Sequence, residues 1–133
     1  MTIEENKALM RRWADARNRT DLPAALDCWI EEKRDWLRAA FGRFTTGFPD
    51  LHFTIEELIS EGDKVVMRWT LRGTHRGNLR GLPATGRTVA VTGQVIDRVV
   101  DGRVVEEWVD YDTAGLLRQL GFALVVPAGA PAP

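Results

Sequence analysis

The sequence predicts an α+β domain in which helices come first and an antiparallel sheet follows. Apolar residues recur at helical spacing over residues 3–47, whereas apolar and polar residues alternate with the period of a strand over residues 51–111. Helices and strands that are segregated along the chain are typical of folds with helices packed on one sheet face. A chain of 133 residues is expected to form one domain with a sizeable core.

Three helices are predicted before the first strand. The first runs from Ile3 to Arg17 and follows a capping-box pattern, Thr2 with Glu5. Asp21 can cap the second helix, and a proline follows in its first turn. A charged segment, EEKRD, then leads to a third helix, which the Gly and Pro of "TTGFPD" end. The apolar face of that third helix comprises Trp36, Leu37, Ala40, Phe41 and Phe44.

Alternation predicts four strands in the second half of the chain. They cover residues 51–60, 65–75, 88–100 and 103–111. The dipeptide Asp-Gly at 101–102 is a hairpin signal, and "GNLRGLPATG" is a wide connection rich in turn residues. Thr113 can cap a last short helix in "GLLRQLG". Residues 123–133, which include "PAGAPAP", are predicted to be disordered.

Composition excludes several classes of function. The formal net charge is -1, so the chain has no basic field suited to nucleic acid or an anionic membrane, and neither is expected as a partner. A lone Cys28 excludes an internal disulfide, and no Cys/His cluster indicates zinc. No leader-like apolar segment or run of ~18 apolar residues occurs, which predicts a cytoplasmic protein. The five Trp residues are expected in the core, or around an aromatic-walled pocket if several converge.

Four stretches carry a family resemblance. They are "NKALMRRWADARNRTDLPAALD", "FPDLHFTIEELISEGDKVVMRWT", "RGTHRGNLRGLPATGRTV" and "DRVVDGRVVEEWVDYDTAGLLRQLG". They resemble the SnoaL-like polyketide cyclase (ester cyclase) family, which belongs to the superfamily of nuclear transport factor 2 and ketosteroid isomerase. The resemblance covers residues 1–30 and 36–121. It implies a single domain over residues 1–122, a cone-shaped α+β barrel with three N-terminal helices on a curved, mostly antiparallel sheet. It also implies a homodimer, formed through the exposed sheet face near Arg68, Thr70 and Arg72.

The chain departs from the family between its second and third helices. Relatives usually carry a short strand and a loop there, often with a His or Asp that faces the pocket. Here Trp29 and Ile30 pass almost directly into residues 31–35, so about fifteen residues are missing by the resemblance. Either the natural protein lacks this strand, or the sequence omits a segment that the natural protein has. The second alternative is favoured, because deleting the strand would expose a sheet edge that proteins normally protect.

The family resemblance implies an intramolecular aldol cyclisation of a hydrophobic, carbonyl-containing small molecule. A pocket carboxylate would act as general acid and base, and no metal or organic cofactor is implied. Burial in a hydrophobic pocket can raise the pKa of such a carboxylate toward the working pH. The alternative is a non-catalytic ligand-binding or dimerisation domain of the same superfamily. The epoxide hydrolases of the superfamily need an Arg-x-Asp motif, which "THRGN" lacks.

Asp110 is the first catalytic candidate. It lies in "EEWVDYD", two residues after Trp108, so both side chains should point the same way. However, a gapless alignment from "LLRQLG" places the family's catalytic Asp opposite Val109, and a shift of one residue reverses the facing of a strand. A bulge could reconcile the two registers. The alternative for Asp110 is a solvated carboxylate at a strand end.

Two further carboxylates compete with Asp110. Glu107 has the opposite parity, so only one of the two can point inward in a regular strand. Asp97 shares parity with the valines of its strand and should face inward, where it would need Arg, His or a raised pKa. If a bulge at Gly93 reverses the register, Gln94 or Ile96 faces the pocket instead.

His75 is the second catalytic candidate. By resemblance it stands at the pocket mouth, where it could orient a carbonyl or donate to an oxyanion. The alternative is a His that is hydrogen-bonded to the loop that follows it. The expected substrate-binding residues are Trp108, Trp69, Met67, Leu71, Asp97 and Glu107, of which Trp69, Met67 and Leu71 could equally be core.

Overall fold

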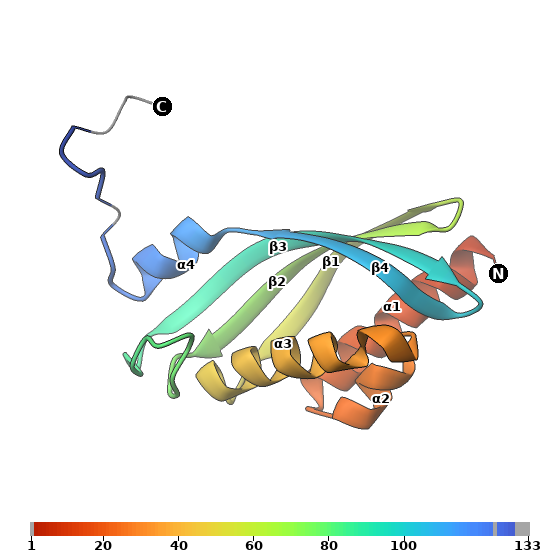
Figure 1. The fold of residues 1–133 in the computed structure, drawn as a ribbon, viewed down its shortest axis with the longest axis horizontal. Coiled ribbons are helices and arrows are strands. Elements are labelled where there is room, and N and C mark those ends of the chain that lie inside the picture. The colour runs from red at the N-terminus through yellow and green to blue at the C-terminus, as the bar shows by residue number, and fades with distance from the viewer. Residues whose placement is uncertain (1, 124, 130–133) are drawn as a thin grey trace.

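The computed structural model describes residues 2–123 and 125–129 and confirms the α+β class. The elements in chain order are α1 (Ile3–Asn18), α2 (Leu22–Asp27), the 3-10 turn η1 (Glu31–Lys33), α3 (Arg34–Gly47), β1 (His52–Glu61), β2 (Lys64–Thr74), β3 (Thr88–Val100), β4 (Arg103–Tyr111) and α4 (Thr113–Gln119). The first three helices lie on one side of the curved sheet, and α4 follows β4 at one end of it (Figure 1).

The helix starts follow from their capping residues. Thr2 and Glu5 form the predicted capping box at the start of α1. The Asp21 side chain accepts a hydrogen bond from the backbone N–H of Ala24 at the start of α2, as predicted. The predicted cap of α4 was wrong by one residue. Asp112, and not Thr113, caps α4, because its carboxylate accepts from the backbone N–H of Gly115 at 2.8 Å.

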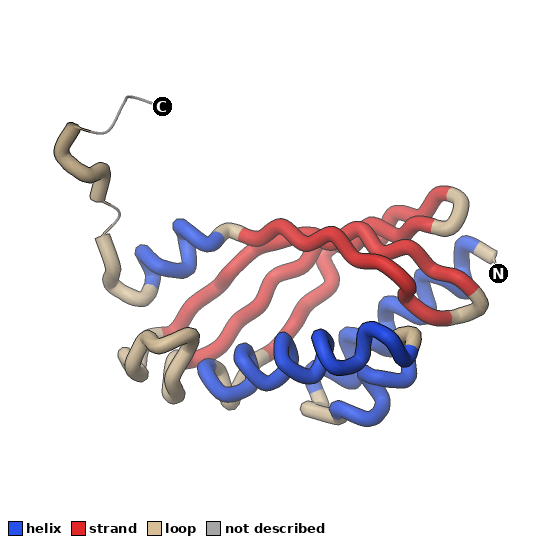
Figure 2. Tube along the Cα trace, in the orientation of Figure 1, coloured by secondary structure: helices blue, strands red, loops and turns tan. Residues whose placement is uncertain are grey.

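The sheet is an antiparallel meander of four strands in the order β1-β2-β3-β4. The strands bend together over the helices, as Figure 2 shows. β3 extends past the end of β4, which leaves the edge of its first residues without a strand partner. The Gln119 side chain of α4 occupies that edge, because its amide bonds both the N–H and the C=O of Ala90. This pairing explains why α4 packs beside β3.

One extra residue in β4 decides which side chains face the helices. Arg98 pairs with Glu106, but Val99 pairs with Val104, so Val105 is a bulge residue without a partner on β3. Val104 is buried, and beyond the bulge the inward positions are the odd-numbered ones, beginning with Glu107. On β3 the pairing continues without a shift through Gly93, so the alternative of a bulge there is wrong.

The short connection between α2 and α3 makes only one contact of the strand type. Trp29 forms a parallel bridge with Val104, supported by hydrogen bonds from Ile30 N–H to the Val104 carbonyl and from Val104 N–H to the Cys28 carbonyl. In the part of the chain that the structure describes, no strand continues along β4 from this bridge. The edge of β4 is therefore open beside the cavity described below.

The main core lies between α1, α3 and the inward face of the sheet. It contains the buried rings of Trp29, Phe48 and Trp69, with Met67 and the inward valines of β3. Of the tail, residues 125–129 form no helix or strand, while the remaining predicted disorder falls partly on residues outside those described. Within the described residues, no helix is long and apolar enough to cross a membrane.

Candidate functional site

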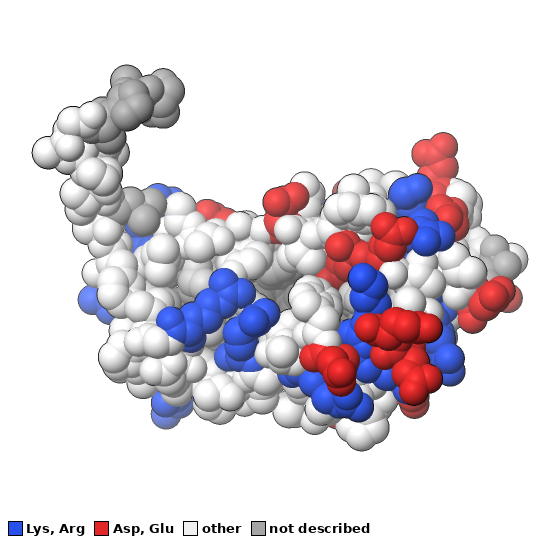
Figure 3. All heavy atoms as spheres, in the orientation of Figure 1, with Lys and Arg blue, Asp and Glu red and all other residues white. Residues whose placement is uncertain are grey.

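A cavity of about 220 Å³ opens between α1, α3 and the inward face of the sheet. The molecular surface is hollowed on the face that Figure 3 shows. The lining is mainly apolar and aromatic, with a few ionisable groups, which is the composition typical of a small-molecule site. The lining residues are Trp13, Arg17, Trp36, Leu37, Ala40, Phe41, Arg43, Phe44, Phe53, Trp69, Leu71, Arg80, Val95, Glu107, Val109 and Tyr111.

Stacked rings form the sheet side of the cavity. The Trp69 ring lies 5.0 Å from Phe53 and 6.4 Å from Tyr111, measured between centroids. The cross-strand neighbour of Trp69 is Gly93, and a Cβ built there would overlap the indole ring. Gly93 therefore gives Trp69 the space to lie across the sheet. Trp13 packs edge-on against Phe53 at 5.4 Å, so aromatic residues from α1, β1, β2 and β4 converge.

Two carboxyl groups meet at the inner end of this cavity. Asp97 on β3 and Glu107 on β4 are directly paired across the sheet and share its inward face, an arrangement that puts Cβ atoms about 5 Å apart. Asp97 is 0% exposed, and neither of its carboxyl oxygens receives a hydrogen bond from an N–H or O–H group in the described residues. Glu107 lines the cavity and is only partly buried.

Burial raises the pKa of both carboxyl groups. The pKa of Asp97 lies well above its usual range, first because of desolvation and then because of the charge of Glu107 and a hydrogen bond to it. Desolvation also raises the pKa of Glu107, although a hydrogen bond from Asp97 and the charge of Arg17 oppose that increase. The causes differ for the two groups: the hydrogen bond between them raises the pKa of Asp97 and lowers that of Glu107, so Glu107 is the group of the pair that ionises more readily.

Arg17 supplies a buried positive charge on the helix side of the cavity. Its guanidinium lies 4.5 Å from the centroid of the Phe41 ring. Burial lowers its pKa to about 10, an effect that the charge of Glu107 partly offsets, so Arg17 stays protonated at neutral pH. Sequence reasoning did not select Arg17, although its position four residues after Trp13 places it on the apolar face of α1.

Asp110 and Trp108 do not face the cavity, so the expectation of an inward Asp110 is wrong. Both side chains point the same way, as predicted, but to the outer face of the sheet, where Trp108 is 48% exposed and Asp110 is exposed. Asp110 borders a shallow depression there with Arg68 and Gln94. The Val105 bulge causes this reversal, since it turns the odd-numbered residues of β4 inward.

His75 also lies outside the cavity lining, contrary to its expected place at a pocket mouth. It is fully buried, and its Nδ1 accepts from the backbone N–H of Thr85 at 3.3 Å and lies 3.1 Å from the hydroxyl of the same residue. Its ring packs near Phe48 at 5.7 Å. The structure thus places His75 in hydrogen bonds with the loop that follows it, which was the alternative interpretation.

The other expected binding residues divide between the cavity and the core. Trp69, Leu71 and Glu107 line the cavity, and Asp97 lies behind Glu107. Met67 is buried in the core and does not line the cavity. Val109, which the family resemblance aligned with a catalytic Asp, lines the cavity as an apolar residue.

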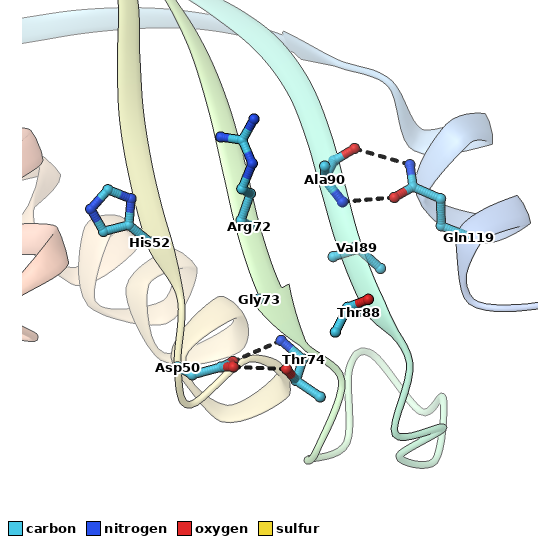
Figure 4. Close-up of a pocket in the computed structure, with 9 residues that line it drawn as sticks. All are labelled: Asp50, His52, Arg72, Gly73, Thr74, Thr88, Val89, Ala90 and Gln119. Carbon is cyan, nitrogen blue, oxygen red and sulfur yellow. Dashed lines mark hydrogen bonds between the residues drawn. The ribbon is translucent and has the colours of Figure 1, made fainter.

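A second, shallower depression lies on the other face of the sheet, at the ends of β1, β2 and β3 (Figure 4). Its carboxylate and its amide are both bonded within the protein. The Asp50 carboxylate accepts hydrogen bonds from the backbone N–H and the hydroxyl of Thr74, both at 2.7 Å, and the Gln119 amide is bonded to the main chain of Ala90. Among the described residues, no cluster of three His, Cys, Asp or Glu side chains could hold a metal ion.

The family model of the SnoaL-like polyketide cyclases matches residues 7–120, which include most of α1 and every later element through α4. The chain belongs to this family. The match confirms the family resemblance seen in the sequence, and it extends over both strands that carry the buried carboxyl pair.

Curated relatives carry more specific names. The chain is 35% identical over 96 residues to the aklanonic acid methyl ester cyclase DnrD of Streptomyces peucetius, an alignment that covers 71% of this chain and 61% of that protein. It is 37% identical over 98 residues to the aklanonic acid methyl ester cyclase DauD of Streptomyces sp. strain C5, covering 71% and 55%. The chain thus spans between about half and three fifths of the length of these relatives.

Solved structures confirm the fold. TsrD from Streptomyces laurentii superposes with a TM-score of 0.85 at 31% identity, over 91% of this chain and 98% of that one. AclR from Streptomyces galilaeus, provisionally assigned as a hydroxylase, superposes with a TM-score of 0.84 at 30% identity. The superposition covers 96% of this chain and 87% of AclR. IdmH from Streptomyces antibioticus, provisionally assigned as a polyketide cyclase, superposes with a TM-score of 0.79 at 26% identity. The superposition covers 88% of this chain and 99% of IdmH.

Proposed function

We propose that this protein is a cyclase that closes a carbon ring in a carbonyl-rich polyketide, with Glu107 as its general base and acid. The observation that carries the proposal is a carboxyl group with a raised pKa that lines an aromatic cavity and has a buried carboxyl partner behind it. A base is most effective when its pKa lies near the working pH, and burial moves Glu107 in that direction. The names of the curated relatives support this reaction class.

The proposed reaction is an intramolecular aldol addition. The Glu107 carboxylate removes a proton from a carbon atom activated by neighbouring carbonyl groups, and the enolate attacks a second carbonyl of the same molecule. One carbon–carbon bond forms as the carbonyl π bond becomes an alkoxide, and Glu107 returns the proton to that alkoxide. Product and substrate are isomers, so the step consumes no oxidant, reductant or water. The aromatic walls would hold the substrate folded and exclude solvent.

Asp97 and Arg17 are positioning residues in this proposal. Asp97 has no direct place in the cavity lining, but its proton can be donated to one Glu107 oxygen, which leaves the other oxygen as the base. The charge of Arg17 keeps the pKa of Glu107 from rising as far as burial alone would raise it. Together they would favour the ionised form of Glu107 within a cavity of low polarity.

A second candidate function is ligand binding without catalysis. Val109 favours it, because an apolar residue lines the cavity where the family resemblance aligns a catalytic Asp. Under this alternative the cavity would bind a hydrophobic small molecule and Glu107 would only orient it. Replacing Glu107 would then change the affinity for that small molecule, and there would be no turnover to lose.

We also propose a homodimer through the outer face of the sheet. One apolar residue from each strand forms a continuous cross-strand row on that face: Ile59, Val66, Ile96 and Trp108. Ile59 is 55% exposed and Ile96 is 39% exposed. A contiguous row of exposed apolar side chains is typical of a protein–protein interface. Light scattering should give the mass of a dimer for the native protein and that of a monomer for Ile96→Glu.

The decisive experiment compares Glu107→Gln with Asp110→Asn on aklanonic acid methyl ester, the compound in the names of the relatives. Glu107→Gln should lower turnover on the order of a hundredfold or more because it removes the base. Asp110→Asn removes a carboxylate from the same strand on the outer face and should leave turnover unchanged. Equal turnover in Glu107→Gln and the native protein would contradict the assigned role, whereas loss of activity in Asp110→Asn would restore the first expectation from the sequence.

A further inference from the structure

The mouth of the cavity carries two arginines that sequence reasoning did not select. Arg43 on α3 and Arg80 in the connection between β2 and β3 are both exposed, and both line the cavity. Like most arginines of the described residues, neither of them forms an ion pair in the structure, so both guanidinium groups can reach a ligand. Basic side chains gather over this connection and the adjoining part of α3 on the face seen in Figure 3.

The fold brings the two arginines to the same side of α3. Leu79 is buried and packs on Gly47 of α3, which lies four residues after Arg43 on the same side of that helix. Leu79 and Leu82 exchange backbone hydrogen bonds of 3.0 and 2.9 Å, so residues 80 and 81 form the tip of a tight turn. Arg80 adopts a left-handed backbone at that tip, with φ of 49°. The turn therefore presents Arg80 on the side of α3 that carries Arg43.

The ionisable lining of the cavity is cationic in a chain whose net charge is -1. Three guanidinium groups, Arg17, Arg43 and Arg80, face one carboxyl group, Glu107. Guanidinium groups bind planar oxyanions through paired hydrogen bonds, and they bind them more strongly than neutral oxygen groups. The excess of positive charge around an aromatic hollow matches a flat aromatic molecule with one anionic oxygen group.

We propose that Arg43 and Arg80 form a subsite for an anionic oxygen group, a carboxylate or an ionised enol or phenol, on the aromatic ligand of this cavity. The inference rests on the proposed function, because it takes the cavity to be the ligand site. It adds a charge preference that Glu107 does not supply, since a carboxylate would repel an anion. The subsite orients the ligand with its charged end at the mouth and its neutral carbonyl groups toward Glu107.

The test uses two probes of equal shape, 2-naphthoate and the neutral 2-naphthamide, measured by calorimetry with the full chain. The native protein should bind the carboxylate about tenfold more tightly than the amide, and the ratio should fall at 0.5 M salt. The double variant Arg43→Gln/Arg80→Gln should bind both probes equally, and each single variant should lose about threefold of the preference. Arg76→Gln, which alters an exposed residue of the same connection outside the lining, should keep the full ratio.

The outcomes separate this inference from the proposed function. Equal binding of both probes by the native protein overturns the anionic subsite and leaves the role of Glu107 standing. A preference for the carboxylate that survives in the variants of Arg43 and Arg80 also overturns it. If neither probe binds, both the subsite and the ligand cavity of the proposed function fail. Glu107→Gln should keep or increase the carboxylate preference while it lowers turnover, a result that would show that the two sites act separately.

Discussion

The two faces of the sheet differ in how far the fold completes the hydrogen bonds of their polar groups. In the outer depression, both Asp50 oxygens accept hydrogen bonds from Thr74, and the Gln119 amide is bonded to Ala90. On the inward face, the oxygens of the fully buried Asp97 accept no hydrogen bond, and the buried indole nitrogens of Trp13 and Trp69 donate none within the described residues. The fold thus completes the hydrogen bonds of Asp50 and Gln119 in the outer depression, whereas on the inward face it buries polar groups whose hydrogen bonds it leaves incomplete.

The same contrast is visible in the carboxyl groups. Hydrogen bonds from the backbone and hydroxyl of Thr74 lower the pKa of Asp50, whereas desolvation raises the pKa of Asp97. An exposed carboxylate that accepts hydrogen bonds stabilises the fold. Burial without hydrogen-bond donors disfavours the ionised form of a carboxyl group. A carboxyl group that the fold leaves in such an environment is a candidate for chemistry.

The largest expected difference between the two faces concerns turnover. Glu107→Gln in the cavity should reduce kcat on the order of a hundredfold or more, because the amide cannot accept the substrate proton. Asp50→Asn in the outer depression should leave kcat unchanged, since Asp50 does not line the cavity. Steady-state kinetics on the same cyclisation substrate measure both effects. Similar losses in the two variants would mean that the loss reflects folding and not chemistry.

The second difference concerns the pH dependence of stability. A raised folded pKa means that Asp97 contributes stability that is fully present below its unfolded pKa, about 4, and is lost as the pH rises through the folded value. Asp97→Asn should therefore raise the free energy of unfolding more at pH 8 than at pH 4. Urea unfolding at both pH values measures this change.

Asp50 provides the control for that titration. Its folded pKa is lowered, so its stabilisation is present above pH ~4 and is lost as the pH falls. The Asp50→Asn variant should consequently lose stability at neutral pH and converge with the native protein in acid. If the stability of Asp97→Asn follows the same course as that of Asp50→Asn, the raised pKa of Asp97 is refuted.

A third difference concerns packing at two glycines. Gly93→Ala should destabilise the protein by about 1–3 kcal/mol, because the new methyl group overlaps the Trp69 ring. Gly42→Ala on α3 meets no atom within 4 Å and should be neutral or stabilise the protein by up to about 1 kcal/mol. Thermal unfolding compares the two variants. Binding of 2-naphthamide should weaken only in Gly93→Ala, since only that variant displaces a cavity ring.

The smallest expected effect lies at the edge of β3. Gln119→Ala removes two hydrogen bonds to Ala90, which are exposed to solvent, and should lower the free energy of unfolding by about 1 kcal/mol. Hydrogen exchange of the Ala90 amide should accelerate, while turnover stays unchanged. A drop in turnover would show that the edge of β3 is coupled to the cavity.

Much of the fold could be predicted from local patterns, but the facing of β4 could not. The Thr2–Glu5 capping box and the alternation in β2 and β3 act over a few residues and indicated their elements correctly. The choice between Asp110 and Glu107 depended on the Val105 bulge, which exists only because β4 pairs with β3. No pattern within β4 distinguishes a regular strand from one with a bulge.

By itself, the amino-acid sequence determined the order of the elements, the alternation of β3 that turns Asp97 inward, and the membership in the family. Tertiary structure decided which charged groups meet in the cavity, since Arg17, Arg80 and Glu107 come from segments that are far apart in the chain. The physical reason is that helical and strand periods are local, whereas burial, desolvation and pairing depend on what the rest of the chain places opposite each side chain.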